Sequence, residues 1–311
     1  MYFSNLDKKK EIKKVLNQKG ICVAKNFLNK KKILKIRNKV KKKLNDFKAL
    51  KAPRDIKKTN ENNIKLNRSK WLPKKYQQAY REDQFKQPTG DISYKVSQKI
   101  LRKGFKFYSK FTNSVELKDP LIQIKEINEI IFNKKIYDIA KVFLNEEPFL
   151  GYIALRCHFK NNLPDTDFQF FHTDSRNKIT LKKDELLKFL IPFNLEKNEK
   201  NEFSQIIYKR NKIKNDDFYK LQYSKYSELP KYLKKKLISP LVKNGDGYFF
   251  DPENFFHNAK KPKKLRIILY LVFVKKNNYM ISKTKKIKIR EKDYIKLNIL
   301  QKRFVKFLKK I

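Results

Sequence analysis

Cysteine, glycine and long apolar runs are scarce in this 311-residue sequence. The two cysteines, Cys22 and Cys157, form no CxxC pair, so a disulfide scaffold is excluded and a cytoplasmic compartment is expected. Six glycines are too few for a fold dominated by tight two-residue hairpins. The longest apolar run, Ile267 to Val274, is far shorter than the roughly 20 residues that span a bilayer. The N-terminus lacks the apolar stretch of a secretory signal, so we expect a soluble protein without a transmembrane segment.

The charge balance is strongly one-sided. Lys and Arg number 78 against 31 Asp and Glu, which gives a formal net charge of +47. A field of this sign attracts nucleic acid, acidic glycans and anionic membrane surfaces. Lysine, asparagine and isoleucine are all abundant, however, and the basic residues are spread along the whole chain, which also fits a general compositional bias. The 40% hydrophobic and 14% aromatic shares indicate a packed core in either case.

The first half of the chain predicts mainly helices. They are expected over residues 7–19, 29–47, 96–112 and 119–147. Asn29 is a suitable N-cap for the second of these, whose apolar residues step by three and four. The β-branched run over residues 21–27 predicts a strand between the first two helices. Residues 51–95 are polar, lack a period and contain three prolines, which predicts an irregular connection that could cover an active site.

The second half changes to a period of two at Gly151, which is typical of β-strands. Strands are expected over residues 151–159, 168–172, 186–194, 203–208 and 265–274. Residues 209–242 are basic and tyrosine-rich, and we interpret them as an insertion between strands. Apolar residues of the tail recur at helical spacing, which predicts a C-terminal helix packed on the core, with a membrane-surface or partner helix as the alternative. These residues are Leu297, Leu300, Phe304, Phe307 and Ile311.

Histidine carries the strongest chemical signal because the chain has only three. His172 stands two residues before Asp174, and positions i and i+2 of a strand face the same side. His257 follows a turn and precedes the last apolar run. Two imidazoles and one carboxylate leave three positions open on an octahedral iron, as in non-haem Fe(II) oxygenases. We predict a metal site of His172, Asp174 and His257. His158 is the rival ligand, but it has no partner at i+2, which favours a role in the core or behind the ligands.

Arg266 is the candidate for binding a co-substrate. It lies nine residues after His257, inside an otherwise apolar strand. A buried guanidinium is costly without an anionic partner, and it can hold a carboxylate through two parallel hydrogen bonds. The competing interpretation is an ion pair with a structural acid such as Asp246 or Asp251.

Several of these motifs resemble those of the phytanoyl-CoA dioxygenase-like branch of the Fe(II)/2-oxoglutarate dioxygenases, and the resemblance covers most of the chain. Residues 18–44 are similar to the strand and helix with which that family begins. FFHTD resembles its first metal motif, GDGYFFDPENFFHNA its second, and LRI its 2-oxoglutarate anchor. These motifs assign His172, Asp174 and His257 as ligands and Arg266 as the anchor. The turn around KNE and the alanine two positions after His257 depart from the family pattern.

The resemblance implies a mainly β fold with flanking helices, namely a double-stranded β-helix of the jelly-roll, cupin-like type. Residues 1–311 would form a single dioxygenase domain. Within it, residues 1–150 would be a mostly helical N-terminal part, residues 151–274 the jelly-roll core and residues 275–311 a basic helical tail.

The implied cofactors are Fe(II) and 2-oxoglutarate, with dioxygen as the second co-substrate. The implied activity is hydroxylation of a C–H bond in a small molecule. The basic surface would favour a small molecule that is anionic. No nucleic-acid partner is expected, because no standard binding motif is visible. Two alternatives stay open. One is an inactive jelly-roll module that binds a polyanion through its basic surface, and the other is a jelly roll with a different metal and no 2-oxo acid.

Overall fold

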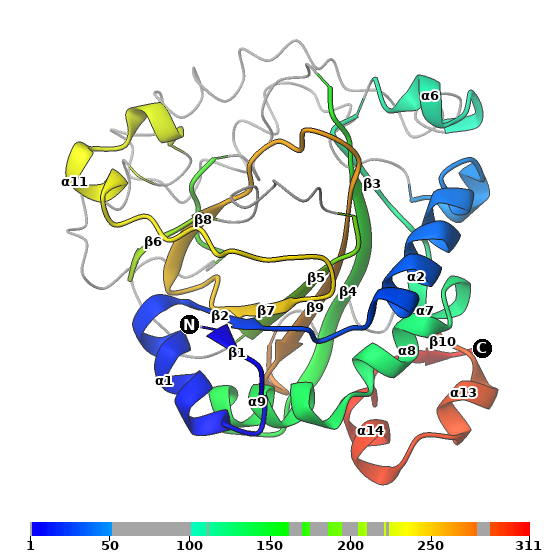
Figure 1. The fold of residues 1–311 in the computed structure, drawn as a ribbon. Helices are drawn as coiled ribbons and strands as arrows, with labels where there is room; N and C mark the ends of the chain where they lie inside the picture. Colours follow the sequence, from blue (N-terminus) through cyan, green and yellow to red (C-terminus); the bar gives the residue numbers. More distant parts are fainter. Residues whose placement is uncertain are drawn as a thin grey trace.

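The protein is mainly β, with helices packed around its main sheet (Figure 1). The computed structural model describes residues 2–51, 101–110, 112–161, 170–174, 186–194, 205–209, 221, 224–278 and 287–311. Nearly all of the irregular connection predicted over residues 51–95 lies outside this part of the chain, as do residues 210–220, 222 and 223 of the insertion predicted over 209–242.

The main sheet has seven strands in the order β1-β2-β7-β5-β9-β4-β3. Its strands are β1 Tyr2–Phe3, β2 Ile21–Ala24, β3 Ser114–Glu116, β4 Phe149–His158, β5 Leu186–Pro192, β7 Gly247–Phe250 and β9 Arg266–Val274. All pairings in it are antiparallel except that of β1 with β2. The long β9 lies between β4 and β5, so it connects the two halves of the sheet.

A smaller sheet closes the fold. It pairs β6 Gln205–Lys209 with β8 Phe255–Asn258, and residues 171 and 172 extend it through isolated bridges to Ser224 and His257. Phe255 of β8 packs in the same cluster as Leu190 and Ile268 of the main sheet. Strands that alternate between two facing sheets in this way form a double-stranded β-helix, which confirms the predicted fold class.

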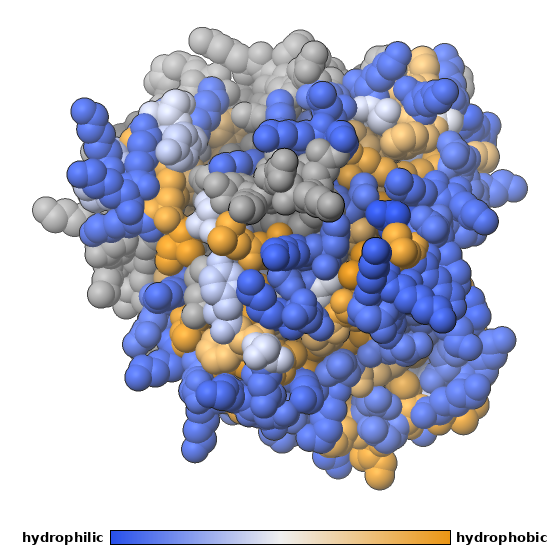
Figure 2. Space-filling view, viewed as in Figure 1, coloured by the Kyte–Doolittle hydropathy of each residue, from blue (hydrophilic) through white to orange (hydrophobic). Residues whose placement is uncertain are grey.

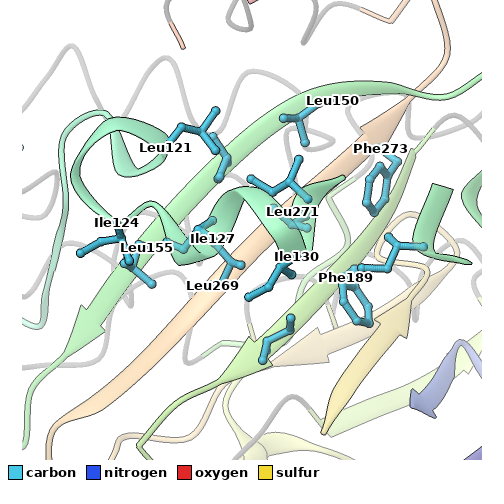
Figure 3. Packing of buried hydrophobic residues seen from close by; sticks show 14 of the residues in the cluster. Leu121, Ile124, Ile127, Ile130, Leu150, Leu155, Phe189, Leu269, Leu271 and Phe273 are labelled. Carbon is cyan, nitrogen blue, oxygen red and sulfur yellow. The ribbon is translucent and has the colours of Figure 1, made fainter. Parts of the chain in front are cut away.

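The two faces of the main sheet have different neighbours because successive side chains of a strand point to opposite sides. The outer face carries Phe189 and Leu269, and it packs against helices in the largest core cluster. Figure 3 shows this packing, with Leu121, Ile124, Ile127 and Ile130 set against sheet residues. The inner face carries Leu190 and Ile268 and looks toward β8. This double coverage explains why β2, β5 and β9 are apolar at nearly every position.

Most helices lie on the outer face, whereas the one that carries Leu233 packs against Phe171 and Phe256 of the smaller sheet. In chain order the helices are α1 Lys9–Lys19, α2 Lys30–Lys43, η1 Phe47–Ala49, α6 Phe105–Tyr108, α7 Pro120–Gln123, α8 Glu126–Ile131, α9 Lys134–Leu144, η3 Tyr226–Glu228, α11 Lys231–Lys234, α13 Glu291–Ile295 and α14 Ile299–Phe304. The predicted N-cap is confirmed, because Asn29 Oδ1 accepts a hydrogen bond of 2.9 Å from the amide of Lys32. Both cysteines are buried and free. None of the described helices is long and apolar enough to cross a membrane.

Two helical predictions were wrong in extent. The stretch expected over 119–147 is three helices, because Asn133 accepts from the amide of Lys135 and starts a new helix at α9. The single C-terminal helix expected from Leu297 to Ile311 is instead α14 followed by the short strand β11 Lys309–Lys310, which pairs with β10 Lys288–Ile289. Leu300 and Ile311 of the predicted buried face are exposed.

Gly20 links α1 to the smaller sheet. It ends the helix at φ +73°, and a Cβ there would lie 2.4 Å from the ring of Phe255 at the start of β8. Gly104 also has a positive φ, +86°, but a Cβ there would meet nothing within 4 Å. Gly20→Ala should therefore lose about 1–3 kcal/mol more unfolding free energy than Gly104→Ala, since only Gly20→Ala adds overpacking to backbone strain. Urea unfolding of both variants measures the difference, and equal losses would show that Phe255 yields freely.

Candidate metal centre

Three side chains converge beside the smaller sheet, where His172 pairs with His257. The Nε2 atoms of His172 and His257 each lie 3.6 Å from Oδ1 of Asp174, and the two imidazole ring centroids are 4.5 Å apart. Ligand atoms that share a first-row metal at about 2.1 Å are about 3–3.5 Å from one another. The observed separations are close to that spacing. Among the described residues, these three form the group of His, Cys, Asp and Glu side chains able to hold an ion.

Backbone pairing holds the two histidines side by side although 85 residues separate them in sequence. His172 and His257 exchange both amide-to-carbonyl hydrogen bonds, at 3.0 and 2.9 Å. The amide of Asp174 donates to the carbonyl of Pro252 at 2.8 Å. This hydrogen bond holds the backbone of Asp174 against the turn that precedes β8. The i, i+2 spacing of His172 and Asp174 predicted two of the ligands together. Pairing in the smaller sheet brings the third, His257, beside them.

Each imidazole is oriented through its other nitrogen. His172 Nδ1 lies 2.8 Å from the carbonyl oxygen of Phe170, and His257 Nδ1 lies 3.2 Å from that of Phe255. A carbonyl can only accept, so Nδ1 carries a proton in both rings, and Nε2 is the nitrogen that faces Asp174. This is the arrangement in which metal-binding histidines are normally held.

The ionisation states also suit a cation. Burial, and then the neighbouring His172, lower the pKa of His257 to about 3, although Asp174 acts in the opposite direction. For Asp174, burial raises the pKa, but the ammonium of Lys188 and both imidazoles outweigh burial and hold the pKa well below its usual range. At neutral pH the centre therefore presents a neutral His257 and a carboxylate. Both are already in the metal-binding form.

Lys188 is a residue of this centre that the sequence reasoning missed. Its ammonium contacts Oδ2 of Asp174, the oxygen that faces away from the histidines, and lies 5.3 Å from the Phe250 ring centroid. The same Phe250 ring stands edge-on to His257, with centroids 5.1 Å apart. A lysine inside the apolar run Leu186–Pro192 has the signal used for Arg266, a charged group in a buried strand, and could have been found by it.

Removal of Lys188 should weaken metal binding. Lys188→Met removes the contact that aims Asp174 at the histidines, and supporting partners of this kind are worth about 10- to 100-fold in metal affinity. Loss of a nearby positive charge favours metal binding and partly offsets this effect. We therefore expect metal affinity to fall by about tenfold, the lower end of that range. A competition titration with a divalent metal measures it. The matched control is Lys288→Met, because Lys288 also pairs with an aspartate, Asp119, but outside the metal centre. Equal affinity of both variants would contradict the role of Lys188.

Arg266 lies at the opposite end of the inner face. It is 1% exposed, pairs across the sheet with His158, and donates from Nη2 to the carbonyl of Lys260 at 2.8 Å. Val272, the β9 residue opposite Lys188, follows Arg266 by six positions, which is about 20 Å between the two Cα atoms. The guanidinium of Arg266 reaches Lys260, only three residues after His257. The inner face is thus bracketed by two buried cations, with Lys188 at the metal end.

Polar side chains of β4 and β9 lie between these ends. The Nε2 atom of His158 is 3.2 Å from the hydroxyl of Tyr270, and the guanidinium of Arg156 lies 5.0 Å from the Tyr270 ring centroid. Arg156 forms a buried ion pair with Glu116, which also accepts from the hydroxyl of Tyr152 at 2.8 Å. His158 therefore supports the inner face and is not part of the metal group, as the sequence suggested.

His158 should make stability pH-dependent. Burial and then the charges of Arg266 and Arg156 lower its pKa well below the ordinary value of about 6.5. The unfolded chain takes up the proton first, so stability is full above that ordinary value and falls as pH decreases through it. The native protein should therefore lose unfolding free energy between about pH 7.5 and pH 5, and His158→Phe should reduce that loss by up to about 2 kcal/mol. Chemical unfolding of metal-free protein at both pH values tests this, and parallel losses in native and variant would refute it.

Sequence comparisons and structure comparisons give different results. A scan against protein-family models finds no match, and no curated protein matches the sequence. The chain is similar to a solved structure of the non-heme alpha ketoglutarate dependent epimerase SnoN from nogalamycin biosynthesis, with 9% identity, a TM-score of 0.45, and coverage of 87% of this chain and 83% of that chain. A structure of SnoN in complex with Fe3+, alpha ketoglutarate and nogalamycin RO has 8% identity, a TM-score of 0.49, and coverage of 87% and 84%.

Proposed function

We propose that the chain is an Fe(II)- and 2-oxoglutarate-dependent oxygenase, of the phytanoyl-CoA dioxygenase-like kind, that hydroxylates a C–H bond of a small molecule. The observation that supports this best is the convergence of Nε2 of His172, Nε2 of His257 and Oδ1 of Asp174 on one point. Two imidazoles and one carboxylate on one side of an iron leave the other side for co-substrate and dioxygen. In this proposal these three residues hold the iron and are the catalytic residues.

The donor set fits ferrous iron, and it fits zinc as well, since a set of two histidines and one carboxylate occurs in catalytic zinc sites. What favours iron is the charged inner face beyond the ligands. A dicarboxylate co-substrate needs a cation away from the metal, and Arg266 is a buried arginine on that face. A zinc hydrolase has no such requirement.

When bound, iron and 2-oxoglutarate supply the oxidising power for C–H cleavage by consuming dioxygen, with release of succinate and carbon dioxide. The chain's own residues bind and orient the co-substrate and substrate, and they exclude water from the site. Arg266 would hold the distal carboxylate of 2-oxoglutarate through paired hydrogen bonds. Lys188 would keep Asp174 turned toward the histidines, and β8 would cover the inner face beside Phe250.

An anionic small molecule is the substrate class that this charge distribution favours. Lys188, Arg156 and Arg266 all lie on the inner face, where Asp174 pairs with Lys188 and Glu116 pairs with Arg156. The formal charge of +47 adds a long-range attraction for anions. Turnover of a charged substrate should therefore fall at high salt, whereas turnover of a neutral one should not.

The test is succinate release from 2-oxoglutarate by iron-loaded protein, with a panel of anionic and neutral metabolites. We expect turnover that requires iron and that His172→Ala abolishes. Zinc-dependent turnover without 2-oxoglutarate would replace the proposal with a different metal chemistry. Steeply salt-dependent binding of a polyanion that survives His172→Ala, with no succinate release from any substrate, would support the inactive module instead.

A further inference from the structure

Exposed aliphatic side chains are concentrated at one end of the molecule. Across the described ranges, five large aliphatic side chains are exposed. One is Leu241, and the other four lie within the C-terminal lobe, which we define as residues 287–311. These four are Ile295, Ile299, Leu300 and Ile311, with exposed fractions of 64, 71, 40 and 53%. Scattered apolar residues need no explanation, but a group of this kind in one short segment does.

These side chains are not the face by which the lobe packs on the core. That face consists of Leu297, Phe304 and Leu308, all buried. The Phe304 ring lies edge-on to Tyr137 of α9 at 5.8 Å and 5.5 Å from Phe273 of β9, measured between centroids. The lobe is therefore docked on the protein by one side. Its exposed isoleucines and leucine lie outside this contact.

The same segment is strongly basic. Residues 288–311 contain nine Lys and Arg and two Asp and Glu, which gives 9 − 2 = +7. In Figure 2 orange side chains emerge between blue ones at the lower right, where Figure 1 places α13 and α14. Apolar side chains ringed by lysine and arginine match the surface of an anionic bilayer, which accepts aliphatic groups below its charged headgroups.

We propose that the C-terminal lobe docks on anionic lipid membranes, with Ile295, Ile299 and Leu300 entering the interface and the neighbouring basic residues contacting lipid headgroups. A protein partner would need a continuous apolar groove or helix face, and α13 and α14 span only five and six residues. A fluid interface needs no complementary shape. The inference is independent of the metal centre.

Sedimentation of the full chain with phosphatidylcholine vesicles, with or without phosphatidylserine, tests this inference. We expect binding to vesicles with phosphatidylserine only. Ile295→Ser/Ile299→Ser should weaken it roughly tenfold or more, because two aliphatic groups no longer leave water. Leu241→Ser, which replaces an aliphatic residue of 45% exposure elsewhere, should bind like the native chain. Lys302→Gln/Arg303→Gln should also weaken binding.

Two results would overturn the proposal. If the isoleucine variant sediments as the native chain does, the general charge of +47 is the cause and the lobe has no special role. If the native chain does not sediment with either vesicle, the exposed aliphatic group serves a protein partner or none. Unchanged thermal unfolding of the variants shows that each substitution leaves the fold intact, and succinate release is not part of the readout.

Discussion

His172→Ala, His257→Ala and Asp174→Asn will each abolish iron-dependent succinate release. Supporting residues behind a metal cost about 10- to 100-fold when removed, so loss of a ligand itself should exceed the upper figure. The fold should survive, because His172 and His257 pair through backbone hydrogen bonds that alanine also makes. Metal titration and succinate measurement on the folded variants give the result.

The chain provides its own control for this prediction. His158, the third histidine, is buried on the inner face and contacts Tyr270 instead of the metal group. His158→Phe should keep metal binding and lose at most part of the turnover. If a ligand variant retains full turnover, or if His158→Phe loses its metal, the assignment of ligands is wrong.

Arg266→Met is expected to raise the concentration of 2-oxoglutarate needed for half-saturation by about 30-fold to a few thousand-fold. This range corresponds to the 2–5 kcal/mol lost when one partner of a buried, hydrogen-bonded charge pair is removed. Metal affinity should change little, since Arg266 lies six β9 positions from the residue opposite Lys188. Titration of 2-oxoglutarate against the iron-loaded variant measures the effect.

Arg266→Lys separates anchoring from structure. Arg266 also donates to the carbonyl of Lys260, so loss of affinity in Arg266→Met could reflect a disturbed strand. Lysine keeps the charge but not the two parallel hydrogen bonds, so it should restore folding and only part of the affinity. Native affinity in both variants would remove Arg266 from the co-substrate site and leave Lys188 as the cation that faces it.

The sequence predicted local features better than distant pairings. Its period of two located β4, β5 and β9, and the His172–Asp174 spacing marked two side chains that converge, although Asp174 lies just past the bridge at His172. It could not show that His172 pairs with His257 or that Lys188 reaches Asp174, because both contacts depend on how the two sheets face each other.

The C-terminal helix failed for a local reason that the sequence did contain. Asn298 accepts from the amide of Gln301 at 2.9 Å, and the Gln301 side chain accepts from the amide of Asn298 at 3.0 Å. This reciprocal capping starts a new helix at Ile299. The helical spacing predicted from Leu297 to Ile311 therefore holds only from Ile299 to Phe304, and the chain then turns into β11. Of the exposed aliphatic residues of the C-terminal lobe, Ile299 and Leu300 lie in α14, and Ile295 and Ile311 lie outside it.

The central claim is that His172, Asp174 and His257 hold an iron to which 2-oxoglutarate binds. Anaerobic addition of 2-oxoglutarate to the Fe(II)-loaded protein tests it most directly, by the visible charge-transfer absorption of the chelate. We predict that the band appears in the native protein, weakens in Arg266→Met at the same 2-oxoglutarate concentration, and is absent in His172→Ala. A native protein that binds Fe(II) but develops no band at saturating 2-oxoglutarate would contradict the claim.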